Sequence, residues 1–203
     1  INQDGYYEIF FGDNAGYFHG VDYLGNPLSG FPIQLPGTAR EIWGSPASGD
    51  IDNDGEIEFI VTSKNKHCYV IDEYGNIELD YETDQYLMAT PSIGNLDNDN
   101  DLEIIFFGYT TSGDVFVINH DGSDLENFPV QLNEKVLKGG AIYDIDNNGK
   151  DDIVVATEND KSIFIIYDNG EFVNIFTSND KFKSAPSILD NNGNITIVAG
   201  DEG

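Results

Sequence analysis

The chain has 203 residues, of which 37 are acidic and 9 are basic, so its formal net charge at neutral pH is −28. This charge excludes general nucleic-acid binding, which needs basic patches, and it disfavours docking on anionic membranes. A hydrophobic content of 39% excludes a disordered chain, and no apolar run is long enough for membrane insertion as a helix. The single cysteine, Cys68, cannot form an internal disulfide, and its apolar surroundings predict a buried structural thiol.

A short acidic loop recurs along the chain. Its clearest copy is Asp50-Ile51-Asp52-Asn53-Asp54-Gly55-Glu56-Ile57-Glu58, with oxygen-bearing side chains at positions one, three, five and nine and glycine at position six. Further copies lie at 95–103 and 144–152, the end of a partial copy lies at 2–5, and a degenerate copy lies at 189–193. The fifth positions are Asp4, Asp54, Asp99, Asn148 and Asn192, which are 44 to 50 residues apart. Such a period is typical of repeat folds.

The same order of short β-segments follows each loop. A first apolar strand is predicted at 8–12, 58–63, 103–108, 152–157 and 196–200, and a second one at 17–22, 67–72, 115–119 and 163–167. A glycine turn, at Gly25, Gly75, Gly122 and Gly170, leads into a more polar strand at 31–35, 77–82, 128–132 and 172–176. A small strand that often contains proline, at 45–46, 90–91, 139–140 and 184–186, begins the next unit. No segment has a helical period.

These units predict an all-β protein. A four-stranded antiparallel sheet cannot bury both faces by itself, so the units must stack, and radial stacking gives a β-propeller. We expect a single propeller region over 1–203, with blade units at 1–42, 43–87, 88–135 and 136–182 and the start of a fifth at 183–203. The segment at 31–35, Phe-Pro-Ile-Gln-Leu, recurs as Phe-Pro-Val-Gln-Leu at 128–132, which indicates duplication of a two-blade unit. Because the strands do not fill whole blades, we expect part of a ring of about six to eight blades, with a closed four-bladed ring as the alternative.

The acidic loop is suited to a hard cation. Alternate carboxylates followed by a glycine allow a short loop to wrap around one ion, and ligands that are all oxygen favour calcium. An EF-hand would need a glutamate at loop position twelve and flanking helices, whereas position twelve here is Val61 and the flanks are β-rich. The loop is therefore predicted to be a calcium turn between two strands. Because Asp, Asn and Gly also favour turns without metal, a plain turn is the alternative for any single copy.

The residues at 49–55, Gly-Asp-Ile-Asp-Asn-Asp-Gly, followed by Glu58-Phe59-Ile60-Val61, resemble the FG-GAP/VCBS repeat of integrin-α-type β-propellers. Phe11-Gly12 and Phe107-Gly108 are similar to its Phe-Gly element, and Ser45-Pro46 and Ala185-Pro186 are similar to its Gly-Ala-Pro element. The resemblance covers essentially the whole chain. It implies about three Ca²⁺ sites. Each lies in the loop between the first strand of a blade, which is the small strand that opens the unit, and the second, which is the apolar strand after the acidic loop.

The resemblance assigns as ligands the side chains at loop positions one, three, five and nine and the backbone carbonyl at position seven. The three sets are Asp50, Asp52, Asp54, Glu58 and the Glu56 carbonyl; Asn95, Asp97, Asp99, Glu103 and the Asp101 carbonyl; and Asp144, Asp146, Asn148, Asp152 and the Lys150 carbonyl. Asn100 replaces the glycine of the second loop and is expected to tolerate the same positive φ. The third set has one carboxylate fewer than the first, which should weaken it. The first copy of the loop keeps only Asn2, Asp4 and Glu8. The fifth copy keeps only Asp190 and Asn192, and no metal is expected there.

In propellers that the chain resembles, the metal loops lie on one face, and the loops after each second strand and between blades lie on the opposite face. We predict a ligand surface there that includes Arg40, Trp43, Tyr86 and Tyr109, because aromatic residues near an arginine suit a protein or sugar surface. The alternative is that Trp43 packs between blades.

The sequence gives no strong signal of catalysis. It lacks the Gly-x-Ser-x-Gly, His-Glu-x-x-His and phosphate-binding glycine motifs, and His19, His67 and His120 are expected to be packing or surface residues. We therefore expect a secreted or cell-surface, calcium-stabilised propeller that serves as a scaffold for adhesion or for binding a protein or glycan. The remainder of the propeller, or another chain, would complete the ring. The alternative is the propeller module of a secreted carbohydrate-active enzyme or protease.

Overall fold

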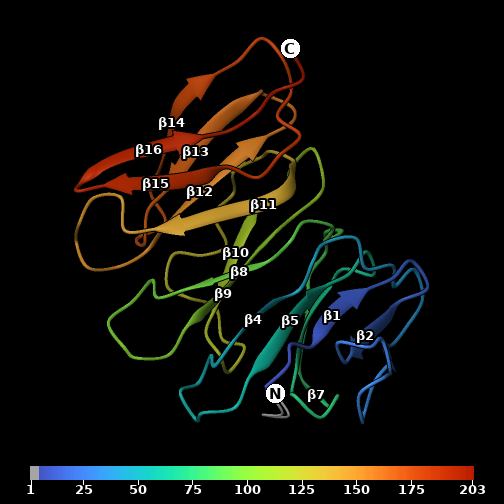
Figure 1. The fold of residues 1–203 in the computed structure, drawn as a ribbon. Coiled ribbons are helices and arrows are strands. Elements are labelled where there is room, and N and C mark those ends of the chain that lie inside the picture. Colours follow the sequence, from blue (N-terminus) through green and yellow to red (C-terminus); the bar gives the residue numbers. More distant parts are fainter. Residues whose placement is uncertain (1–4) are drawn as a thin grey trace.

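The structure, a computed structural model, describes residues 5–203, which form five antiparallel sheets (Figure 1). The strand orders are β1-β2-β3, β4-β5-β6-β7, β8-β9-β10, β11-β12-β13-β14 and β15-β16. The strands are β1 (Ile9–Gly12), β2 (Tyr17–Val21), β3 (Ile33–Gln34), β4 (Ala47–Gly49), β5 (Glu58–Thr62), β6 (His67–Ile71), β7 (Ile77–Glu82), β8 (Ser92–Gly94), β9 (Glu103–Phe107), β10 (Val115–Ile118), β11 (Val136–Tyr143), β12 (Asp152–Thr157), β13 (Ser162–Ile166), β14 (Phe172–Thr177), β15 (Ser187–Asn191) and β16 (Asn194–Val198). In this part of the chain, no helix is long and apolar enough to cross a membrane.

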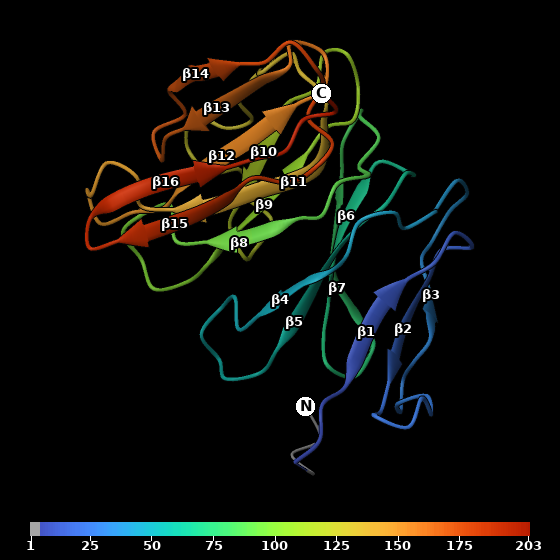
Figure 2. The same cartoon turned by 45° about the horizontal axis from the view of Figure 1, so that its top comes forward.

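The sheets are arranged radially. The first strands of the last four sheets, β4, β8, β11 and β15, contact one another in that order. Figure 2 shows β8, β11 and β15 side by side, while β3 and β14 lie at the periphery. The strands of each sheet pair antiparallel, and each pair of successive sheets shares an apolar cluster between its facing sides. This is the architecture of a β-propeller with antiparallel blades, as the repeats predicted.

Alternate residues of each central strand face opposite neighbours. In β5, Phe59 and Val61 belong to the apolar cluster between the first and second sheets, whereas Ile60 belongs to the cluster between the second and third. The same alternation occurs in β9 and β12. Because both faces are covered, these strands are continuous apolar runs rather than alternating ones. Cys68 is buried in the cluster between the second and third sheets, as predicted, and burial raises the pKa of its thiol.

The small strands that open each unit begin later than predicted. Residues 45–46, 90–91 and 184–186 precede β4, β8 and β15, and each of these strands starts directly after a proline. Proline has no N–H group to donate, so the hydrogen-bonded ladder starts behind it. The fourth blade has Gly139 and Gly140 in place of proline, and β11 runs through both.

Two outer strands are also shorter than predicted. Residues 31–35 contribute only β3, and within 128–132 only Val130 is bridged, to Val115. Pro32 and Pro129, each preceded by a cis peptide bond, cannot donate to a ladder. The corresponding segments without proline form β7 and β14 close to the predicted bounds. The third sheet therefore has three regular strands rather than four.

The predicted glycine turns are present. Gly25, Gly75, Gly122 and Gly170 all have φ between +80° and +87°. The N–H group of each donates to the carbonyl three residues earlier, at 2.9 to 3.2 Å. A positive φ is sterically open to glycine, so these positions fix where the chain reverses after the third strand of a blade.

Candidate metal centres

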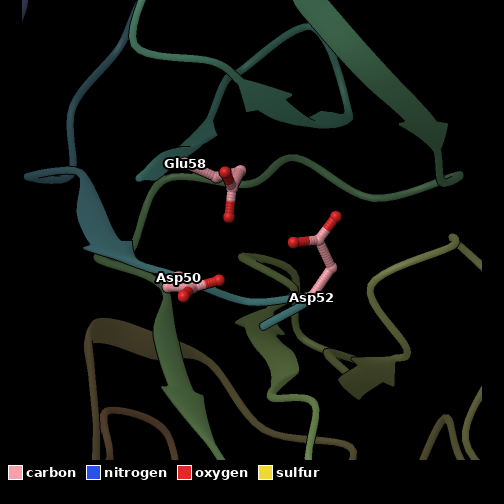
Figure 3. A group of neighbouring side chains, drawn as sticks. All are labelled: Asp50, Asp52 and Glu58. Carbon is pink, nitrogen blue, oxygen red and sulfur yellow. The ribbon is translucent and has the colours of Figure 1, made fainter. Parts of the chain in front are cut away.

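Three groups of carboxylates recur at one end of the sheets, in the loops after β4, β8 and β11. In each group, ligand atoms from three side chains lie within 4.8 Å of one another. The groups are Asp50, Asp52 and Glu58; Asp97, Asp99 and Glu103; and Asp144, Asp146 and Asp152. Figure 3 shows the carboxylates of the first group turned toward a common space. The structure thus brings together residues far apart within each nine-residue loop.

Backbone N–H groups curl the first loop around Asp50. Its Oδ1 accepts from the N–H of Asp54 at 3.1 Å, and its Oδ2 accepts from the N–H of Gly55 at 3.0 Å. Asn53 and Gly55 have φ of 59° and 94°, which a bulky or β-branched residue would adopt only with strain. The third loop repeats this arrangement around Asp144, with Asn147 and Gly149 at φ of 61° and 93°.

The second loop folds differently. The expectation that Asn100 takes the conformation of the missing glycine is wrong, because neither Asn98 nor Asn100 has a positive φ. Asn95 does not accept the bonds that Asp50 accepts in the first loop; its amide Nδ2 instead donates to the carbonyl of Asp99 at 3.0 Å. Asp99 thereby enters the carboxylate group of this loop. Replacing both a carboxylate and a glycine has changed the path of the loop while keeping three acids together.

The acid at position nine is buried in every loop. Glu58, Glu103 and Asp152 are 5%, 1% and 0% exposed. Each accepts the N–H of position two, from Ile51 at 2.9 Å, Leu96 at 2.5 Å and Ile145 at 2.8 Å. Burial raises the pKa of all three carboxyls, and that of Glu103 reaches about 7. A buried acid with a raised pKa is costly to ionise alone, and a bound cation would remove that cost.

The position-five side chains have a local role in all three loops. Asp54, Asp99 and Asn148 each accept the N–H of position seven, at 2.8 to 2.9 Å. Asp54 lies outside the carboxylate group of its loop, whereas Asp99 combines this bond with membership of a group.

The position-seven side chains differ from loop to loop. Asp101 pairs with His120 at 3.2 Å, and Lys150 pairs with Asp168 at 3.0 Å. Burial and the acids around it raise the pKa of Glu56. The side chains of Asp101 and Lys150 are therefore engaged in ion pairs, and the role of position seven as a carbonyl ligand stays a prediction.

Successive metal loops are bonded to one another. The N–H of Leu102 in the second loop donates to the carbonyl of Ile51 in the first at 2.8 Å. The N–H of Asp151 in the third loop donates to the carbonyl of Asn95 in the second at 2.7 Å, and the Asp151 carboxylate accepts the Asn95 N–H at 3.0 Å. Position eight makes both links, which the spacing of the acidic residues does not predict. Ordering one loop thus affects the next.

The degenerate fifth copy is a tight hairpin. Asn192 and Gly193, with φ of 53° and 84°, form the turn between β15 and β16. The Asp190 carboxylate accepts the N–H of Gly193 at 2.7 Å and the hydroxyl of Tyr143 at 2.9 Å. Asn2 and Asp4 of the first copy lie outside the described residues.

The predicted ligand surface is only partly assembled. The Arg40 guanidinium donates to the carbonyls of Ala15, Leu35 and Gly37, so it supports loops. Tyr86 faces the ammonium of Lys66 at 5.8 Å, and Tyr109 faces that of Lys135 at 5.2 Å. Trp43 is 57% exposed, so the alternative that it packs between blades is wrong.

No protein-family model and no curated protein matches the sequence. Several solved structures are similar to the structure of this chain. The C-terminal domain of Pseudomonas aeruginosa PilY1 is 15% identical, with a TM-score of 0.70, over 97% of this chain and 52% of that one. BBS1N, in its complex with ARL6DN, is 12% identical with a TM-score of 0.65, over 96% of this chain and 56% of that one. BamB from Moraxella catarrhalis is 18% identical with a TM-score of 0.60, over 99% of this chain and 54% of that one. The chain spans about half the length of these structures, and such likeness shows the propeller fold alone.

Proposed function

We propose that this chain is a calcium-stabilised β-propeller region of the FG-GAP/VCBS type that serves as an interaction scaffold on a secreted or cell-surface protein. One observation carries the proposal: a group of three carboxylates recurs in the loops after β4, β8 and β11, in three successive sheets. A plain acidic turn explains one such group poorly and three still less, because like charges held within 4.8 Å repel one another.

The donor set favours calcium over other metals. Every side chain in the three groups is a carboxylate, and no cysteine or histidine belongs to any of them. Hard oxygen ligands on a nine-residue loop suit calcium, whose coordination is large and flexible, better than zinc or copper. Calcium sites with a Kd of only about 10⁻⁴ M are filled outside cells, so even weak sites would be occupied at the proposed location.

The partner of the scaffold is a protein or a glycan. The propeller fold and the absence of a catalytic motif in the sequence support a binding role. One propeller of similar fold, BBS1N, was crystallised in complex with another protein, ARL6DN.

A further sheet, from the same protein or another chain, is proposed to cover the first blade. Ile9 and Phe11 are 56% and 43% exposed, yet they occupy the positions of Phe59 and Val61, which are buried against the preceding blade. An apolar face of this kind is suited to one more blade of the ring.

Calorimetric titration of the metal-free chain with CaCl₂ tests the proposal. We expect uptake of about three ions per chain, weaker binding of Mg²⁺, and a rise in Tm of about 5 °C or more at saturation. Mg²⁺ binds less well because it requires compact octahedral geometry. Absence of calcium uptake by the folded chain would refute the metal part of the proposal.

A further inference from the structure

A cavity of about 280 Å³ lies at the end of the inner strands opposite the metal loops. Its apolar lining is Trp43, Met88 and Leu137, and its polar lining includes Ser45, Thr90 and Lys138. Trp43 and Met88 precede β4 and β8, and Leu137 is the second residue of β11, so three consecutive blades contribute to it. We call this cavity the axial pocket.

The repeat itself brings these residues together. Each apolar lining residue follows a buried anchor, which is Ile42, Leu87 or Val136. A Cβ atom on Gly44 would lie 2.6 Å from the carbonyl oxygen of Ala89, and one on Gly139 would lie 2.5 Å from that of Thr90. The N–H of Ser45 donates to the Thr90 hydroxyl at 3.2 Å. Glycine at two positions thus lets the three segments touch through their backbones, which places their side chains around one space.

Basic residues gather at this end of the molecule. In an antiparallel blade, the turns after the first and third strands lie at one end, which is the end with the metal loops. The turn after the second strand and the link to the next blade lie at the other end. Of the nine basic residues, only Lys150 lies at the metal end. The other eight are Arg40, Lys64, Lys66, Lys135, Lys138, Lys161, Lys181 and Lys183. Acidic residues such as Glu41 and Glu134 also lie at this end, but the pocket lining itself has one basic residue, Lys138, and no acidic one, so a carboxylate is electrostatically favoured beside Lys138.

Two aromatic–lysine pairs extend the surface outward from the pocket. Tyr86 lies two residues before Met88, and Lys66 faces its ring at 5.8 Å. Lys135 lies two residues before Leu137 and faces the ring of Tyr109 at 5.2 Å. The rings hold ammonium groups along the same segments that line the pocket, so apolar and cationic groups alternate across three blades.

We propose that the axial pocket binds an acidic protein segment. An apolar side chain of the segment would enter between Trp43, Met88 and Leu137, and a neighbouring carboxylate would pair with Lys138. Methionine and leucine walls offer dispersion contacts but no hydrogen bonds to sugar hydroxyls, so an apolar side chain fits them better than a glycan does. This inference depends on the proposed role as a scaffold and names its site and the chemistry of its partner.

Fluorescence anisotropy with calcium-saturated protein tests the inference. The probe is a library of fluorescein-labelled hexapeptides, each with one leucine, methionine or phenylalanine flanked by aspartate and glutamate. We expect members with a Kd below about 100 μM, and we expect Trp43→Ala and Lys138→Glu each to weaken binding by about tenfold or more. The matched controls Tyr74→Ala, at the metal end, and Lys161→Glu, in the turn after β12, should leave binding unchanged.

Besides the absence of any peptide binding, three outcomes would overturn the inference. They are equal binding of a library with lysine in place of the acids, binding that the two pocket variants do not reduce, and preferential binding of an acidic oligosaccharide such as oligogalacturonate. Circular dichroism and calcium uptake are measured on every variant, so loss of folding is separated from loss of binding. Normal calcium uptake without peptide binding rejects the axial pocket and leaves the calcium proposal standing. Peptide binding without calcium uptake rejects the calcium proposal and leaves the axial pocket standing.

Discussion

Position three of each metal loop combines two functions. Asp52, Asp97 and Asp146 each contribute a carboxylate to a metal group and also accept a backbone N–H from position five, at 2.8 to 3.2 Å. Asparagine would retain the acceptor oxygen and lose the charge. We therefore expect each Asp→Asn variant to fold and to lose one calcium site, lowering the calorimetric stoichiometry by about one ion.

Glu171→Gln is the matched control for these variants. Glu171 is exposed, lies at the same end of the sheets in the turn between β13 and β14, and belongs to none of the carboxylate groups. Calcium stoichiometry should be unchanged in this variant. If Asp52→Asn also leaves the stoichiometry unchanged, the first loop is an ordinary acidic turn and the assignment of its ligands is wrong.

Glu158, in the turn after β12, is tied to the segment that links the fourth sheet to the fifth. This buried carboxylate lies 2.5 Å from the Lys183 ammonium and 3.6 Å from that of Lys181. The hydrogen bond from Lys183, followed by the charges of both lysines, lowers the pKa of Glu158 below its ordinary 4.5. A lowered pKa means that the pair stabilises the fold above pH 4.5 and that this stabilisation is lost as the pH falls through the folded-state pKa.

Glu158→Gln is accordingly expected to lower the free energy of unfolding by about 0.5–1 kcal/mol near neutral pH, since the lysines are largely in solvent. The deficit relative to the native chain should shrink as the pH falls below 4.5. Urea denaturation at a series of pH values measures it. A deficit that is constant across that range would show that the charge pair is not its source.

Among the elements, the central strands were the most predictable. Both faces of β5, β9 and β12 are covered by neighbouring blades, so their sequences are unbroken apolar runs that predict strands without ambiguity. The inner strands were misplaced by a few residues, because proline removes a donor at their start. The short β3 and the missing outer strand of the third blade have the same cause, and the sequence alone does not show how far a proline interrupts pairing.

The metal loops show where prediction from the sequence ends. Their spacing predicted that the acids at positions one, three and nine come together in the first and third loops, but Asp54, also expected there, lies outside the first group. The altered path of the second loop was not predictable, because it depends on a side-chain bond from Asn95 to the backbone of Asp99. The links through Leu102 and Asp151 were not predictable either, since they join loops about one repeat apart and involve backbone atoms that any residue has.

Close approach of the inner strands depends on small residues at their ends. A Cβ atom on Gly94, the last residue of β8, would lie 2.6 Å from Cγ2 of Ile142 in β11 and 3.1 Å from the Asp151 carboxylate. We expect Gly94→Ala to lower the free energy of unfolding by about 1–3 kcal/mol, because two blades must move apart.

Gly200→Ala is the control for this effect. A Cβ atom there would have its nearest contact at 3.6 Å, to the Ser184 hydroxyl, and Gly200 does not have a positive φ. Its cost should stay within about 0.5 kcal/mol. Equal denaturation midpoints for the two variants would show that the inner strands do not need a glycine at this position.

At the scale of the whole molecule, the basic residues are segregated along the propeller axis. The metal end concentrates three groups of carboxylates, whereas eight of the nine basic residues lie at the other end. Without a cation, the groups repel internally, and the net charge of −28 adds a further unfavourable term to the folded state. Calcium and simple salt should therefore both stabilise the chain, but by different routes: calcium occupies the groups, and salt screens them.

The triple variant Asp52→Asn, Asp97→Asn, Asp146→Asn separates these routes. In EDTA at about 0.02 M ionic strength it should have a higher Tm than the native chain, because one charge has been removed from each group. Raising NaCl to about 0.5 M should raise the native Tm more than that of the variant, since screening acts on a repulsion that the variant has largely lost. Saturating calcium should reverse the order, because only the native loops can bind it fully. Differential scanning calorimetry measures all three comparisons, and an EDTA Tm of the variant below that of the native chain would mean that the carboxylate groups stabilise the fold without a cation.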